Sequence, residues 1–131
     1  MVNQVIYPAV FHFDDDGTSV LFPDLPGCIT CGNNEKEAVE MAKEAMGLHL
    51  YSMEIDGEDF PTPSSIRDIK TDKNEAVCLI SVYMDAFRDE RNRKLKKKTL
   101  TIPLWIDEIA IDKGVNVSKV LERALKDYMG L

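Results

Sequence analysis

The chain has 131 residues, of which 44% are hydrophobic, so its length suits one ordinary domain or two very small ones and its composition favours a packed core over disorder. No stretch approaches the roughly 18 apolar residues of a membrane-spanning helix, and the opening MVNQVIYPAVFHF lacks the features of a secretory signal. Three cysteines, an odd number, are typical of a reducing compartment, and we expect a cytoplasmic protein.

The net charge of −7 is divided unevenly along the chain. Residues 1–90 hold 6 Lys or Arg and 18 Asp or Glu, a balance of −12, whereas residues 91–131 hold 10 and 5, a balance of +5. The basic part suits a polyanion. The acidic part suits a basic partner, if it binds anything, and the alternative is that its acidic surface only keeps the chain soluble.

The first third of the chain predicts three strands. Apolar residues alternate over residues 4–13, and Pro8 indicates an edge position or a bulge there because proline lacks a backbone donor. The Asp-Asp-Asp-Gly run of residues 14–17 predicts a hairpin turn. A second strand, a rigid turn and a short third strand follow, at residues 19–22, 23–27 and 28–32.

An amphipathic helix is predicted next. Asn34 is a candidate N-cap, Glu37 completes a capping-box pattern, and the apolar spacing continues to about Met53. Residues 56–65 read as a loop, and the apolar, β-branched residues 75–84 as a buried strand. The N-terminal part is therefore a β-β-β-α-β unit of the α+β class.

The C-terminal part predicts a linker at residues 85–97, a strand at residues 98–104 and two short helices. Gly114 is placed to end the first helix, and the second begins near Asn116. So small a unit cannot bury its own apolar face. Two copies would solve this, with their strands paired antiparallel and their four helices packed together.

TLTIP, residues 99–103, and GVNVSKVLERALKDYM, residues 114–129, resemble the ribbon-helix-helix family. In that family a two-stranded ribbon enters the DNA major groove. Strand alternation would turn Lys97, Thr99 and Thr101 outward, where the family places its base-reading residues. The resemblance implies DNA contacts by Lys97, Lys98, Thr99, Thr101, Asn116, Val117, Ser118 and Lys119. It implies a homodimer held by Leu100, Ile102, Leu104, Trp105, Leu121 and Leu125. The alternative is a solvated lysine linker with helices that only dimerise.

A second resemblance covers the N-terminal part. FPDLPGC (residues 22–28), TCGNNEKEAVEMAKEAM (residues 30–46) and DGEDFPTPS (residues 56–64) look like HicB-type antitoxins. The resemblance implies a partial ribonuclease-H-like domain that binds HicA, a small basic toxin that cleaves messenger RNA, and covers its active site. It also implies that the C-terminal domain represses the operon. The candidate toxin contacts are Phe22, Pro23, Asp24 and Leu25.

We therefore expect a non-enzymatic antitoxin with a toxin-binding domain at residues 1–84, a linker at 85–97 and a ribbon-helix-helix domain at 98–131. We expect no cofactor and no metal. Two alternatives stay open: a ribbon-helix-helix regulator whose N-terminal domain senses a small ligand, and a small metal-dependent nuclease.

Several side chains could suggest other chemistry. Asp14, Asp15 and Asp16, with Asp24 and Glu40, could bind metal, but nothing in their spacing makes them converge. Cys28 and Cys31 lack the further ligands of a zinc site and the helix start of a redox site. We expect the remaining candidates to have structural roles: Cys78 in the core, His12 and His49 as ordinary histidines, and Trp105 as a core or dimer anchor.

Overall fold

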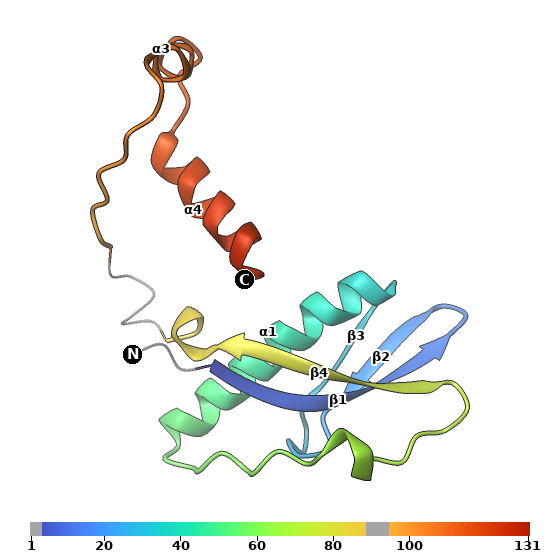
Figure 1. The fold of residues 1–131 in the computed structure, drawn as a ribbon. Helices are drawn as coiled ribbons and strands as arrows, with labels where there is room; N and C mark the ends of the chain where they lie inside the picture. Colours follow the sequence, from blue (N-terminus) through green and yellow to red (C-terminus); the bar gives the residue numbers. More distant parts are fainter. Residues whose placement is uncertain (1–3, 89–94) are drawn as a thin grey trace. The chain divides into compact units, whose positions relative to one another are not determined.

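The computed structural model describes residues 4–88 and 95–131, and their contacts divide the chain into two units, Met1–Arg93 and Lys94–Leu131 (Figure 1). The first four residues of the basic run, 91–94, lie outside the described residues. No helix in the described ranges is long and apolar enough to span a bilayer.

The first unit is a four-stranded antiparallel sheet with one long helix against it (Figure 1). The strand order is β3-β2-β1-β4, which confirms the α+β class and the predicted order of elements. The elements are β1 (Gln4–Asp14), β2 (Gly17–Leu21), β3 (Ile29–Gly32), α1 (Glu35–Ile55), η1 (Ile66–Asp68), β4 (Glu75–Tyr83) and η2 (Met84–Ala86).

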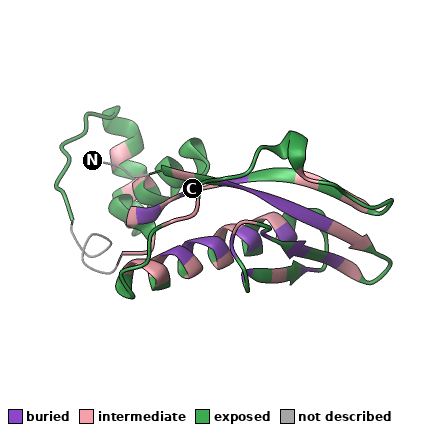
Figure 2. Cartoon of the chain, turned by 90° about the horizontal axis from the view of Figure 1, so that it is seen from below, coloured by how far each residue is buried: buried purple, intermediate pink, exposed green. Residues whose placement is uncertain are grey.

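The core lies between α1 and one face of the sheet. Alternate residues of β1, Tyr7, Ala9 and Phe11, are buried on that face, as the period of two predicts. On α1 the buried residues recur along one side of the helix (Figure 2). A series spaced by four residues is fully buried: Ala38, Ala42, Met46 and Leu50.

The start of α1 is where the sequence places it. The Asn34 side chain accepts a hydrogen bond from the backbone N–H of Glu37 at 2.8 Å, and the Glu37 carboxylate accepts one from the N–H of Asn33 at 3.3 Å. The return contact of the predicted capping box therefore reaches one residue earlier than usual. A Cβ on Gly32 would lie 2.5 Å from the backbone nitrogen of Ala38, so glycine lets β3 run closely into α1.

Two predictions about the strands need correction. The β4 segment is not a fully buried strand. It lies at the edge of the described sheet, next to β1, and Cys78, expected in the core, is exposed, as is Leu79. Apolar β-branched composition alone does not separate a central strand from an edge strand. The β1 strand is interior to the sheet, but Pro8 lies opposite Leu79 of β4, whereas β2 pairs with β1 only from Val10 onward. At Pro8, β1 thus has a strand neighbour on one side only, which suits a residue without a backbone donor.

The packing of the first unit continues past Met84, where the predicted domain ends. The ring of Phe87 lies against α1 at Gly47, where a Cβ would be 2.2 Å from two ring carbons. Arg88 is held by the carboxylates of Glu54 and Asp85, with its Nη1 3.0 Å from Asp85 Oδ1. Residues 87 and 88 therefore belong structurally to the first unit rather than to a linker.

The second unit contains α3 (Leu104–Asp112) and α4 (Val117–Met129), separated by the predicted turn at Gly114, whose φ is 65°. The Asn116 side chain caps α4 by accepting from the N–H of Lys119 at 3.1 Å, which confirms the predicted start. Residues 95–103 form neither helix nor strand, so the predicted strand at 98–104 is not formed in the single chain, and Leu104 opens α3 instead of ending a strand. A strand needs a hydrogen-bonded neighbour, and the described residues of this unit contain none.

Candidate functional site

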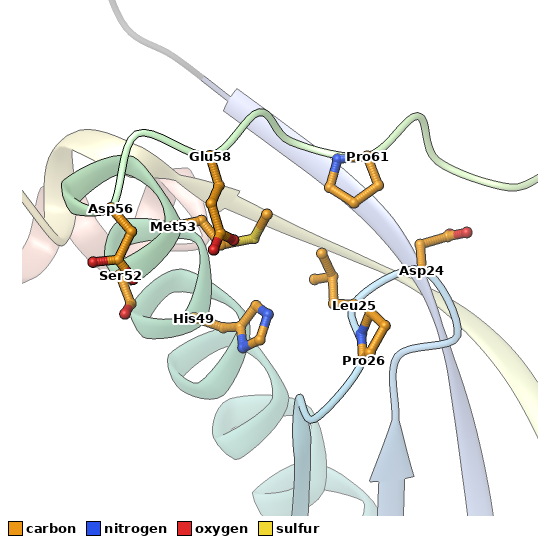
Figure 3. Close-up of a pocket in the computed structure, with 9 residues that line it drawn as sticks. All are labelled: Asp24, Leu25, Pro26, His49, Ser52, Met53, Asp56, Glu58 and Pro61. Atoms are coloured by element: carbon orange, nitrogen blue, oxygen red, sulfur yellow. The ribbon is translucent and has the colours of Figure 1, made fainter.

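A pocket of about 370 Å³ lies in the first unit, at the meeting point of two loops and α1 (Figure 3). The loops are the turn after β2 and the segment after α1, and both belong to the stretches that carry the antitoxin resemblance. The lining residues are Asp24, Leu25, Pro26, His49, Ser52, Met53, Asp56, Glu58 and Pro61.

The turn at residues 22–28 is anchored in the core at its two ends and its middle. Phe22, Leu25 and Cys28 are buried, and backbone hydrogen bonds join the N–H of Leu25 to the Phe22 carbonyl at 3.1 Å and the N–H of Phe22 to the Cys28 carbonyl at 3.2 Å. Among the candidate partner contacts, Phe22 and Leu25 are only 1% and 0% exposed, whereas Pro23 is exposed and Asp24 half-buried. The first pair fixes the turn, and the second pair reaches the surface.

Two contacts join this turn and the sheet to the loop after α1. The Asp24 carboxylate accepts hydrogen bonds from the backbone N–H and the hydroxyl of Ser64, at 2.9 and 2.6 Å. The Tyr7 hydroxyl donates to the Pro61 carbonyl at 2.5 Å, and burial, with a smaller contribution from the charge of Asp24, raises the pKa of Tyr7. The tyrosine therefore stays neutral and can donate its hydroxyl proton to the Pro61 carbonyl. Together, the contacts of Tyr7 and Asp24 hold the loop after α1 against the sheet and the turn after β2.

The pocket lining combines acidic residues with apolar ones. Its lining includes the acidic residues Asp24, Asp56 and Glu58, and no Lys or Arg of the described ranges 4–88 and 95–131. The Asp24 carboxylate is bound to Ser64 and points away from the cavity in Figure 3. In Figure 3 the Glu58 side chain points from the loop toward Met53 and His49 of α1. Leu25, Pro26, Met53 and Pro61 supply the apolar wall. Such a surface can bind a group that combines positive charge with a hydrocarbon stem.

The acidic turn and the cysteines form no comparable site. His12 lies between two carboxylates, with Nε2 3.1 Å from Asp14 and Nδ1 3.3 Å from Glu75, and Asp14 is the first cause of its raised pKa. Within residues 4–88 and 95–131, no group of three or more His, Cys, Asp or Glu side chains is placed to hold a metal ion. Burial raises the pKa of the Cys28 thiol to about 11, while Cys31 is exposed, and both are free thiols.

The residues assigned to DNA and to the dimer all lie in the second unit. Lys97, Lys98, Thr99 and Thr101 are exposed, and a groove of about 240 Å³ is lined in part by Leu100, Ile102 and Leu121. No described residue of this unit is buried. Trp105 is 64% exposed, so it is not a core residue of the single chain.

Sequence reasoning missed most of the pocket. His49 is expected from the sequence to have an ordinary structural role, but it lines the pocket. Nothing in the local sequence marks Ser52, Met53, Asp56 and Glu58 as site residues, because they lie at the end of a helix and in a loop far along the chain from residues 22–28. The signal that could have found them was the shared resemblance of residues 22–28 and 56–64 to one family.

Comparison with known protein families and proteins shows the family of this chain. The family described as "HicB_like antitoxin of bacterial toxin-antitoxin system" matches residues 7–125. Antitoxin HicB 2 of Photorhabdus laumondii is 35% identical over 65 residues, which are 50% of this chain and 47% of that protein, so the chain spans about half of its length. An uncharacterised 14.9 kDa protein of Haemophilus phage HP1 is 30% identical over 99 residues, covering 76% of this chain and 74% of that protein.

Solved structures show the same relationship. A toxin–antitoxin complex from Streptococcus pneumoniae contains a chain that is 27% identical with a TM-score of 0.62, covering 96% of this chain and 99% of that one. The Burkholderia pseudomallei antitoxin HicB is 25% identical with a TM-score of 0.57, covering 92% and 96%. Since the family match extends through both units, this chain belongs to the HicB-like antitoxins of bacterial toxin–antitoxin systems, a non-enzymatic family.

Proposed function

We propose that the chain binds and occludes a HicA-like, mRNA-cleaving toxin through its first unit, and represses its own operon through a second unit that dimerises as a ribbon-helix-helix domain. The observation that carries the proposal is the match of residues 7–125 to one antitoxin family, which takes in nearly all of both units. The similar chain from S. pneumoniae comes from a toxin–antitoxin complex, which supports a toxin as the partner.

The first unit has the charge that this role needs. Residues 1–90 carry a balance of −12, so a positively charged surface, such as one that binds RNA, would be attracted to it. The β-β-β-α-β order agrees with a partial ribonuclease-H-like domain. Inhibition would come from covering the toxin's active site, with no chemistry contributed by this chain.

The second unit supports a dimer because it buries nothing alone. The apolar face of α4 includes Leu121 and Leu125, and α3 begins with Leu104 and Trp105; all four remain at least partly exposed. A second copy would cover these side chains and supply a partner strand for residues 98–103, with Leu100 and Ile102 turned toward the helices. The groove that Leu100, Ile102 and Leu121 line is where that packing would begin.

The same arrangement would present the DNA-contacting residues. Lys97, Thr99 and Thr101 would point from the paired ribbon toward base edges, and Lys98 toward the backbone. Val117 and Ser118 lie in the first turn of α4, where backbone N–H groups have no intrahelical acceptor and can meet a phosphate, with Lys119 beside them. Asn116 would fix this helix start through its cap to Lys119.

The proposal is tested with the product of the neighbouring short reading frame and with the chain's own promoter. The purified chain should stop RNA cleavage by that product, and should retard a promoter fragment with an affinity that falls as salt rises. RNA cleavage that continues at a molar excess of the chain would overturn the toxin half. Promoter binding no stronger than binding to unrelated DNA would overturn the repressor half.

A further inference from the structure

We infer that the pocket between the turn at residues 23–26, the end of α1 and the loop at residues 56–61 receives a lysine or arginine side chain of the toxin. This inference rests on the proposed toxin binding and names its point of contact. It also replaces Phe22 as a contact, because that side chain is buried beneath the turn and does not line the pocket, whereas Leu25 is buried at the pocket wall.

The shape of the pocket suits one long side chain. A volume of about 370 Å³ leaves room for such a side chain together with water, and Leu25, Pro26, Met53 and Pro61 offer apolar surface. Lysine and arginine have hydrocarbon stems that pack on such surfaces while the charged end reaches polar groups. A carboxylate-bearing side chain would find the same apolar wall but, among the described residues, no Lys or Arg in the lining.

The charges of the pocket select a cation. Glu58 and Asp56 line the cavity from the loop after α1, and in Figure 3 the Glu58 side chain points toward Met53 and His49. The Asp24 carboxylate points away from the cavity in the same view and accepts hydrogen bonds from Ser64. An anionic ligand, such as an RNA phosphate, would be repelled by the exposed charges of Asp56 and Glu58, whereas an ammonium or guanidinium group would be attracted. Arg88 does not line the pocket, because Glu54 and Asp85 hold it elsewhere in the first unit.

The end of α1 adds a second, independent preference for positive charge. The helix ends at Ile55 with Asp56 as its C-cap, and its last turn contains no basic residue of its own. The carbonyl end of a helix carries partial negative charge and stabilises nearby cations. Ser52, Met53 and Asp56, which line the pocket, belong to this end of the helix.

The pocket is formed before any partner arrives. Asp24 fixes Ser64 by two hydrogen bonds, and Tyr7 fixes Pro61 by one, so the loop is tied to the turn and to the sheet. A preformed site loses less conformational entropy on binding than one that must be ordered. Asp56 and Glu58 are left exposed, as charges that meet a partner should be.

The first experiment uses the full chain and a probe of the proposed chemistry. Nα-acetyl-arginine amide, titrated into the 15N-labelled chain, should give saturable shifts at the backbone amides of residues 24–25 and 52–58. Nα-acetyl-leucine amide should give none. An arginine probe without saturable shifts at these amides would overturn the assignment of the pocket, whatever the toxin does.

The second experiment measures toxin affinity with matched variants. Asp56→Asn with Glu58→Gln removes two charges at the pocket, and Glu40→Gln with Glu44→Gln removes two exposed charges of α1 that do not line it. The pocket variant should bind the toxin at least about tenfold more weakly than the wild type, and the control within about twofold of it. If the pocket variant and the control variant bound the toxin with equal affinity, the proposed role of the pocket would be refuted, while the proposed toxin binding would still stand. A wild-type chain that does not bind the toxin would instead overturn the proposed function, and the inference with it.

Discussion

At the scale of single residues, the fold depends on a few close approaches. Phe87 packs its ring directly on Gly47, where no side chain fits without a shift. We expect Gly47→Val to destabilise the first unit by about 1–3 kcal/mol, because the added carbons overpack this contact. Urea unfolding measures the change, with Leu48→Val, at an exposed neighbouring position of α1, as the control. A Gly47→Val chain as stable as its control would show that Phe87 does not lie on the helix.

His12 provides a pH-dependent contact between β1 and β4. Its pKa is raised, first by the charge of Asp14 and then by hydrogen bonds to Glu75 and Asp14. A histidine whose folded pKa exceeds its unfolded value of 6.5 stabilises the fold fully below that value, and the contribution is lost as pH rises through the folded pKa. Asp14→Asn should lower the His12 pKa toward 6.5, as followed by NMR of the imidazole protons over a pH series. An unchanged His12 pKa in this variant would rule out the contact.

The sequence placed some of these residues well and others poorly, for physical reasons. Tyr7 and Phe11 follow from strand alternation, which depends only on neighbours along the chain. Cys78 lies in an apolar run that reads as core, yet it is exposed, because burial depends on what covers a strand in three dimensions. Phe22 and Leu25 belong to a motif that reads as a contact surface, although their apolar side chains serve the core.

At the scale of elements, the loop after α1 owes its position to the turn after β2. Asp24→Ala would remove both hydrogen bonds to Ser64, one from its amide and one from its hydroxyl. Hydrogen exchange at the Ser64 amide should become about tenfold faster, since a hydrogen bond to a charged group contributes about 1.5–3 kcal/mol. Asp59→Ala, at an exposed position of the same loop, is the control. Equal exchange in the two variants would mean that the loop holds its place without Asp24.

The segment before α3 is the element for which a second copy matters most. Leu100→Asp should break the dimer and abolish promoter binding, because it puts a charge into the proposed helix-facing side of the ribbon. Leu95→Asp, in the same segment and at a residue 96% exposed, should leave both intact. Light scattering measures whether each variant is a dimer, and a gel-shift assay measures its binding to the promoter. A dimeric, DNA-competent Leu100→Asp chain would refute the ribbon.

Elements whose position is set by residues nearby in the sequence could be predicted, whereas elements whose position depends on a distant strand or another chain could not. The cap at Asn34 and the cap at Asn116 are set by side chains within three residues, and both were placed from the sequence. The edge position of β4 and the strand expected at residues 98–104 depend on neighbours that the sequence does not identify. In the second case the proposed neighbour is another copy of the chain.

At the scale of the whole molecule, charge and packing divide the chain in similar but not identical places. The charge changes sign near residue 91, and contacts separate the units after Arg93. The predicted toxin-binding domain stops at residue 84, which would leave out Phe87 and Arg88 and so uncover Gly47 and release Glu54. A fragment meant to carry toxin binding alone should therefore extend through residue 88.

The most direct test of the proposed function is light scattering after size exclusion, on this chain co-expressed with the product of the neighbouring short reading frame. We predict one shared peak of defined stoichiometry with an even number of copies of this chain, because the proposed toxin-binding and dimerisation surfaces lie in different units. A homodimer eluting without the second protein would contradict the antitoxin role and favour a ligand-sensing regulator. A complex with a single copy of this chain would contradict the dimeric second unit.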